Sequence, residues 1–197
     1  MTMNILVFGA NSDIAKCVIE KLENKNFNIT KIQRSDINFN DLNSSEKIFE
    51  LLENSSPDAI LNFAGVLGDN SDDYEFVFDP NFKSNWDIIR FYVKNTAKNP
   101  IKFLMIGSSS YSSGRRGYML YSASKAALYN LFLSACSFFE KSNFVIGLIN
   151  LPRVKTKMIS HLLSSESDYM EIEESSNYIV DFLLNLRFNA SMDLGVK

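Results

Sequence analysis

The stretch Asn4-Ile-Leu-Val-Phe-Gly-Ala-Asn-Ser-Asp13 decides the fold of this chain. Its first half, up to Phe8, is a short apolar run typical of a strand buried on both faces, and Gly9 ends it. Ile14 to Leu22 then has the apolar spacing of a helix. A buried strand, a tight turn and a helix in direct succession predict the opening unit of an α/β sheet.

The same alternation continues along the chain. Further strands are predicted at Phe27–Gln33, Ala59–Phe63, Ile101–Ile106, Phe144–Ile149 and Met192–Val196. Helices are predicted at Ser44–Glu53, Asn85–Lys98, Tyr121–Phe139 and Asn177–Leu186. Strands that alternate with helices favour a parallel sheet with helices on both faces. Because 197 residues fit one domain with a full core, we predict a single three-layer, doubly wound α/β domain over residues 1–197.

The composition argues against several classes of function. A net charge of -3 gives no reason to expect nucleic acid or an anionic membrane as a partner. No apolar run reaches the length of a membrane span, and no secretory leader precedes the first strand, so we expect a cytoplasmic protein. The sole histidine, His161, cannot build a metal cluster by itself, and no metal is expected. Cys17 and Cys136 lack CxxC spacing, and we expect buried thiols.

Tyr121-Ser-Ala-Ser-Lys125 opens the most apolar of the predicted helices. Residues four apart in a helix lie on one face, so the Tyr121 phenol and the Lys125 ammonium become neighbours. A nearby cation favours the phenolate and lowers the pKa of a phenol from about 10 towards the range useful for proton transfer. The pair therefore predicts an acid–base site. A Tyr and a Lys on a helix surface are the alternative.

Five motifs, taken in order, make the chain similar to the short-chain dehydrogenase/reductase family over nearly its whole length. They are the glycine turn Gly9 to Ala15, Asn62-Phe-Ala-Gly65, Asn85, Ser108, and Tyr121 with Lys125. Ser108 precedes Tyr121 by thirteen residues, which is the usual offset in the family. The resemblance implies a Rossmann fold and a nicotinamide dinucleotide as cofactor.

The resemblance also implies a role for each residue of the motifs. Tyr121 would protonate a carbonyl oxygen, or take the proton back in the reverse reaction, while Ser108 holds that oxygen. Lys125 would lower the pKa of Tyr121 and bind the nicotinamide ribose. Asn85 would anchor a water that relays protons to Lys125. The residues implied for cofactor binding are Gly9, Asn11, Ser12, Asp13, Ile14, Arg34, Asp41, Asn62, Ala64, Gly65, Tyr121, Lys125, Pro152, Val154 and Thr156.

Two segments depart from the family pattern. Asp13 and Ala15 stand where the family usually has glycines. A carboxylate at Asp13 would repel a pyrophosphate unless it turned away to cap the helix, and capping is the interpretation we prefer. The family segment Pro-Gly-x-Val-x-Thr appears as Pro152 to Thr156, one residue shorter and without the glycine.

The end of the second strand bears on the choice of cofactor. A carboxylate there would hold the 2′-hydroxyl of NAD, whereas Gln33 followed by Arg34 suits the 2′-phosphate of NADP. We therefore favour NADP(H) over NAD(H), with a solvated Arg34 as the alternative. Asp41 resembles the aspartate that contacts adenine in the family, although the chain after the second strand is unusually short.

Polar side chains near the mouth of the expected cleft are candidates for reading the substrate. They are Ser110, Arg115 and Arg116 before Tyr121, and Lys155 and Lys157 in a segment around 152–176 that, by the resemblance, covers the substrate. The cations would suit a phosphorylated or nucleotide-linked substrate. Solvated loop charges, or cations paired with the acidic stretch Glu166–Glu174, are the alternative.

The helix Tyr121–Phe139 is apolar nearly all round and must be buried on two sides. One side faces the sheet. A second subunit, packed against the other side and the Asn85 helix, would cover the rest, and we predict a homodimer or homotetramer.

Three hypotheses for the function follow. The first is an NADP(H)-dependent oxidoreductase that reduces a small carbonyl compound or oxidises the alcohol. The second is an epimerase or dehydratase of nucleotide sugars that uses the nicotinamide transiently. The third is a catalytically inactive nucleotide-binding relative, suggested by Asp13 and the short Pro152 segment.

Overall fold

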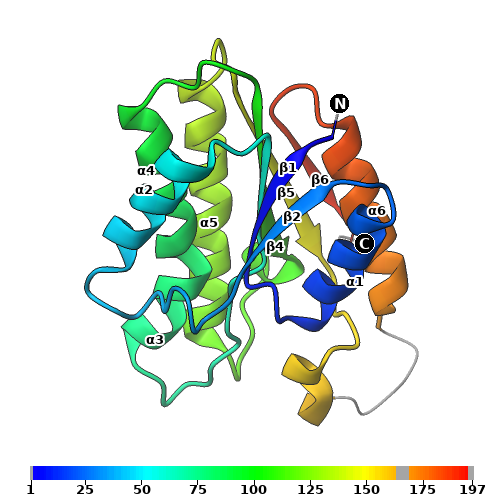
Figure 1. Ribbon diagram of the computed structural model, residues 1–197. Coiled ribbons are helices and arrows are strands. Elements are labelled where there is room, and N and C mark those ends of the chain that lie inside the picture. Colours follow the sequence, from blue (N-terminus) through cyan, green and yellow to red (C-terminus); the bar gives the residue numbers. More distant parts are fainter. Residues whose placement is uncertain (1, 163–168, 195–197) are drawn as a thin grey trace.

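A parallel sheet of six strands, in the order β2-β1-β3-β4-β5-β6, forms the middle layer of the computed structural model, which describes residues 2–162 and 169–194 (Figure 1). The strands are β1 (Asn4–Phe8), β2 (Asn28–Ile32), β3 (Ala59–Asn62), β4 (Ile101–Ser108), β5 (Phe144–Leu151) and β6 (Ala190–Asp193). The inner strands are apolar and mostly buried, whereas most residues of the edge strands β2 and β6 are exposed or half-buried. A strand covered on both faces reads as an apolar run, as observed.

Helices cover both faces of the sheet. They are α1 (Asp13–Glu23), α2 (Ser44–Ser55), α3 (Tyr74–Phe78), α4 (Ser84–Lys94), α5 (Met119–Phe138) and α6 (Ile172–Asn185). Figure 1 shows α1 and α6 on one face and α2, α4 and α5 on the other, and each set closes over its own apolar cluster. Shorter turns are the π-helical η1 (Asp79–Lys83) and the 3-10 turns η2 (Ser109–Tyr111) and η3 (Lys157–Leu162). The predicted three-layer, doubly wound fold is confirmed.

The topology places a crevice at the centre of the sheet. From β1 the chain crosses through α1 to β2 on one side, and it returns through α2 to β3 on the other side of β1. The chain leaves β1 towards α1 and β3 towards α4, which lie on opposite faces of the sheet, so the two connections separate at the carboxyl ends of β1 and β3. Ligands bind at such switch points in open α/β sheets.

The structure corrects several predicted boundaries. α4 ends at Lys94 rather than Lys98, and the helix α3 before it was not predicted. α6 begins at Ile172 rather than Asn177, because the buried hydroxyls of Ser175 and Ser176 both donate to the Ile172 carbonyl and so fit inside a helix. The last strand, β6, is Ala190–Asp193, and Val196, which the prediction included, lies outside the described residues.

Two further observations concern burial. Cys17 and Cys136 are half-buried rather than buried. Within residues 2–162 and 169–194, no helix combines the length and the apolar character that crossing a bilayer would require.

Candidate active site

A cavity of about 780 Å³ opens at the carboxyl ends of the central strands. That volume is ordinary for a site that binds a small molecule or a cofactor. Its walls come from the turn before α1, the ends of β3, β4 and β5, the first turns of α5, and η3. The crevice that the topology creates is therefore a real cavity.

The turn between β1 and α1 forms the first wall. Gly9 has a φ of +69°, and a Cβ at this position would lie 2.6 Å from the Ala64 backbone nitrogen, so only glycine fits. Ser12 caps α1, because its Oγ accepts a hydrogen bond from the Ala15 N–H at 3.2 Å. The other backbone N–H groups at the start of α1 have no partner within the helix, so an anion bound there would be stabilised. Asn11 to Ile14 all line the cavity.

Asp13 has a different role from the one predicted. Ser12 is the cap, and the prediction that Asp13 caps the helix is wrong. The Asp13 carboxylate instead accepts a hydrogen bond at 2.8 Å from the backbone N–H of Lys157, the first residue of η3. Asp13 therefore ties the segment after β5 to the start of α1.

Ser108, Tyr121 and Lys125 meet at a second wall of the cavity. Ser108 ends β4, and its side chain lies near enough to the Tyr121 phenol to lower the pKa of that phenol. The Nζ of Lys125 lies 5.7 Å from the centre of the Tyr121 ring and donates to the Ile106 carbonyl oxygen at 2.9 Å. The predicted catalytic pair and its serine are thus brought together.

Burial dominates the acid–base behaviour of this group. It raises the pKa of Tyr121, and the nearby Ser108 hydroxyl and the Arg115 charge oppose only part of that rise. Burial also lowers the pKa of Lys125 to about 8. The expectation that Lys125 makes the phenol acidic is therefore not met, because the cost of desolvating the phenolate is larger than the attraction of the neighbouring charges.

Asn85 does not line the cavity, whereas Asn81, one helical turn earlier, does. Asn85 is buried, and its amide bonds the Asn62 side chain and the Asn81 carbonyl oxygen. Asn81 lies in the π-helical turn η1, and its side chain exchanges two hydrogen bonds with the backbone of Val66, at 3.0 and 2.9 Å. Asn81 was not predicted from the sequence, and only its position before α4 could have indicated it.

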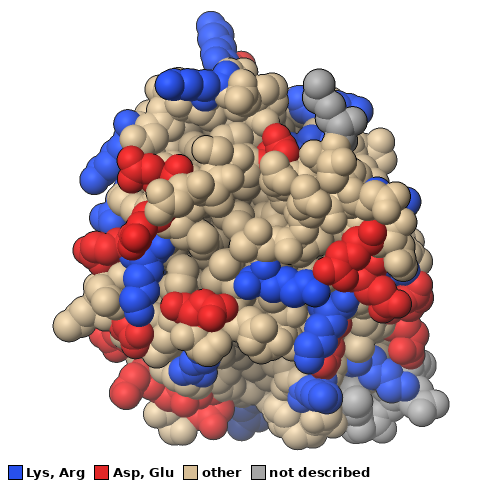
Figure 2. All heavy atoms as spheres, in the orientation of Figure 1, with Lys and Arg blue, Asp and Glu red and all other residues tan. Residues whose placement is uncertain are grey.

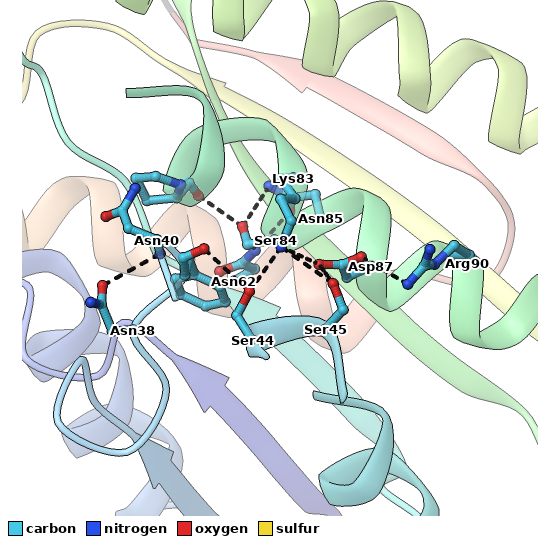
Figure 3. A network of polar contacts seen from close by, with 12 residues as sticks. Asn38, Asn40, Ser44, Ser45, Asn62, Lys83, Ser84, Asn85, Asp87 and Arg90 are labelled. Carbon is cyan, nitrogen blue, oxygen red and sulfur yellow. Dashed lines mark hydrogen bonds and ion pairs between the residues drawn. The ribbon is translucent and has the colours of Figure 1, made fainter. Parts of the chain in front are cut away.

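Asn62 belongs to a buried polar network rather than to the cavity wall. Its Nδ2 donates to Ser84 Oγ at 2.9 Å and to Asn85 Oδ1 at 3.0 Å. Figure 3 shows these groups beside Ser45 and Asp87, where the start of α2 meets α4. The network joins the end of β3 to the helices that carry the asparagines, and so holds the π-helical turn in place.

The remaining predicted residues divide into two sets. Those that line the cavity are Asn11, Ser12, Asp13, Ile14, Ala64, Gly65, Pro152, Val154 and Thr156 for the cofactor, and Ser110, Arg115 and Arg116 for the substrate. Those that do not line it are Gly9, Arg34, Asp41 and Asn62. Arg34 is exposed, and Asp41 accepts a hydrogen bond from Asn38 instead.

The cavity is strongly basic, although the two signs of charge are interspersed on the face of the molecule in Figure 2. Its cationic lining residues are Arg115, Arg116, Lys125, Arg153 and Lys157. Asp13 is the one acidic side chain among the described residues that line it. Arg153, which replaces the glycine of the family segment, was not predicted, and Lys155 lies outside the lining and pairs with Glu171 at 3.7 Å.

Comparison with known families agrees with this geometry. The sequence matches the model of the NAD dependent epimerase/dehydratase family over residues 5–149, well over half of the chain. The chain belongs to this family. The matched residues include the turn before α1 and the whole of α5, so the family match covers most of the cavity. The predicted resemblance to short-chain dehydrogenases/reductases is confirmed.

Solved structures share the fold over almost the full length of the chain. A short chain dehydrogenase family protein from Francisella tularensis has a TM-score of 0.82 at 18% identity, over 99% of this chain and 98% of that one. The 3-alpha-hydroxysteroid dehydrogenase from Pseudomonas sp. B-0831, complexed with NADH, has a TM-score of 0.82 at 12% identity, over 98% and 95%. ElxO with NADP bound has a TM-score of 0.82 at 16% identity, over 99% and 98%. A comparison with curated proteins found no match.

Proposed function

We propose that this chain is an oxidoreductase that uses NADP(H) to reduce a small carbonyl compound, or to oxidise the alcohol, with Tyr121 as the acid or base. The observation that carries the proposal is the meeting of Ser108, Tyr121 and Lys125 on one wall of a cavity that begins at the start of α1. A Tyr and a Lys that merely shared a helix surface would not need a serine beside them at the wall of a cavity.

The cavity fits a nicotinamide dinucleotide. The free amides at the start of α1 suit a pyrophosphate, and Gly9 allows the turn to lie close against the end of β3. Asn11 and Ser12 at one end and Val154 and Thr156 at the other would hold it. Such a cofactor would supply or accept the hydride, leaving the protein to orient the substrate and move one proton.

The side chains suit reduction at neutral pH. Because burial raises the pKa of Tyr121, the phenol keeps its proton and is ready to act as an acid. The Ser108 hydroxyl would donate to the same carbonyl oxygen and hold it against Tyr121. Lys125, with a pKa of about 8, could return a proton to the phenol after each turnover. We propose Asn81, rather than Asn85, as the asparagine that would position a relay water.

The test is the variant Tyr121→Phe. We expect reduction of carbonyl compounds by NADPH to fall at least 1000-fold, because the proton donor is lost, while NADPH binding stays within twofold. Tyr178→Phe, an exposed phenol on α6, is the matched control and should keep full activity. Full activity in the Tyr121 variant would refute the assignment.

The preference for NADP(H) rests on Arg34 and on Gln33, which occupies the place of an acidic residue at the end of β2. Although Arg34 lies outside the cavity, its exposed side chain is free to reach a 2′-phosphate at the edge of the sheet. Arg34→Ala should weaken NADPH binding about tenfold and leave NADH binding unchanged. Equal losses for both cofactors would end the preference.

A second candidate function is supported by the family match, whose description names epimerases and dehydratases. In such an enzyme the nicotinamide is used transiently, and no cofactor is consumed overall. The two functions are separated by following NADPH absorbance with carbonyl substrates and product formation with nucleotide sugars. A chain that bound no nicotinamide at all would instead be the catalytically inactive relative.

A further inference from the structure

Two serines hold Arg115 beside the Ser108 and Tyr121 wall. The backbone N–H of Arg115 donates to Ser122 Oγ at 3.0 Å, and Ser122 directly follows Tyr121. The Nε of Arg115 donates to Ser110 Oγ at 3.4 Å, and Ser110 is buried two residues after Ser108. The two bonds anchor this half-buried arginine at its backbone and near its tip, so its position is defined.

The charge of Arg115 is not neutralised within the described part of the chain. No carboxylate of residues 2–162 or 169–194 forms an ion pair with it, and its two terminal NH₂ groups make no hydrogen bond with those residues. A guanidinium held by its Nε presents these two groups as a fork. That fork matches the two oxygens of a carboxylate or a phosphate.

The other cations of the cavity have different surroundings. Arg153 and Lys157 belong to the segment after β5, and the Lys157 backbone is bound by Asp13 at the start of α1, where a pyrophosphate would lie. Arg116 is exposed, and its carbonyl oxygen accepts a hydrogen bond from Asn70 at 2.9 Å. Arg115 is therefore the arginine placed next to the reacting groups.

Building on the proposed function, we propose that Arg115 binds an anionic group of the substrate, and that the substrate is a short carbonyl compound bearing a carboxylate or phosphate, or the matching hydroxy acid. The anion would be fixed by the fork of Arg115 while the carbonyl oxygen lies at Ser108 and Tyr121. Binding energy from a group that does not react would in this way orient the group that does.

Matched pairs of substrates test the proposal. Butanal is compared with 4-oxobutanoate, and glyceraldehyde with glyceraldehyde 3-phosphate, in the wild type and in Arg115→Gln. We expect the wild type to prefer at least one charged member by 100-fold or more in kcat/KM, and Arg115→Gln to reduce that preference to below fivefold. The pair that shows the preference distinguishes carboxylate from phosphate. Arg187→Gln, which removes an exposed cation that does not line the cavity, should leave the preference unchanged.

The ratio of the two kcat/KM values is the decisive quantity. Arg115 also lowers the pKa of Tyr121, so its loss affects every substrate, and that effect cancels in the ratio. A wild type without preference, or an Arg115→Gln variant that keeps the preference, would overturn the proposal while the proposed function stands. Failure of the proposed function is recognised separately, since the wild type would then reduce neither the neutral nor the charged compounds with NADPH.

Discussion

Lys125 and Tyr121 show how burial changes the chemistry of single residues. Lys125 has 6% of its surface exposed and makes one hydrogen bond, to the Ile106 carbonyl. A buried ammonium without a carboxylate beside it loses much of its solvation, and its proton is held less tightly. The same loss of solvation keeps the Tyr121 phenol protonated. In the protein alone, Tyr121 and Lys125 therefore carry less charge than the phenolate and ammonium that their spacing in the sequence suggests.

The low pKa of Lys125 predicts a pH-dependent stability. The folded protein binds this proton less tightly than the unfolded chain, so its stability rises as the pH increases from about 8 towards 10.5. Between pH 7 and 9.5 the free energy of unfolding of the wild type should rise by about 2 kcal/mol relative to Lys125→Met. Urea unfolding of both proteins at the two pH values measures this change. A constant difference would contradict the buried, weakly basic lysine.

Asp13 places a negative charge where an anion is expected. Asp13→Asn keeps an oxygen that can accept the Lys157 N–H but removes the charge. We expect NADPH to bind about fivefold more tightly, an effect on the order of 1 kcal/mol, because a repulsion next to the pyrophosphate is lost. Fluorescence titration of NADPH measures the change, and Asp181→Asn on α6 is the control. Weaker binding in the Asp13 variant would show that the carboxylate helps the cofactor site.

At the scale of elements, the start of α2 is joined to α4 through one buried carboxylate. Asp87 is buried, accepts a hydrogen bond from Ser45 Oγ at 2.8 Å and lies 3.1 Å from Lys83 Nζ (Figure 3). Arg90 lies on its other side, at 3.6 Å. Because Lys83 ends η1, this cluster also supports the π-helical turn that presents Asn81 to the cavity.

Removing that carboxylate should weaken the whole domain. Asp87→Ala leaves the cations without their shared partner and is expected to lower the free energy of unfolding by about 3 kcal/mol. Glu50→Ala, an exposed acidic residue on α2, should cost less than about 0.5 kcal/mol. Urea unfolding compares the two. Equal small losses would mean that the cluster does not hold the helices together.

At the scale of the whole molecule, α4 and α5 each expose large apolar side chains. Leu133 and Phe138 on α5 are 47% and 65% exposed, and Trp86 and Val93 on α4 are 38% and 43% exposed. α5 buries one side against the sheet, as the sequence predicted. Such exposed side chains favour a partner, and we propose that a second copy of the chain covers them.

The proposed dimer can be tested by replacing two of those side chains with charged ones. The wild type should sediment as a dimer or tetramer, and Leu133→Asp combined with Phe138→Asp should sediment as a monomer, because two buried carboxylates would disrupt the contact. Phe188→Asp replaces a phenylalanine outside α4 and α5 that is more exposed than Phe138, and it should not change the assembly. A monomeric wild type would rule the proposal out.

Local patterns were enough to predict the sheet and the core of the candidate site. Each inner strand is an apolar run of its own, and the alternation with helices determines a parallel, doubly wound order. Tyr121 and Lys125 lie one turn apart on α5, so their spacing already brings them near one another, whereas Ser108 was predicted from the resemblance to the family. Such features depend on periodicity and short offsets, which a sequence displays directly.

The tertiary structure alone decided the rest. Asp13 finds its partner 144 residues away, a contact with no local pattern. The π-helical turn alters the spacing of residues before α4, so Asn81 and not Asn85 reaches the cavity. The pKa values of Tyr121 and Lys125 follow from burial by distant segments. Desolvation and long-range contacts depend on how elements pack against one another, and periodicity along the chain does not carry that information.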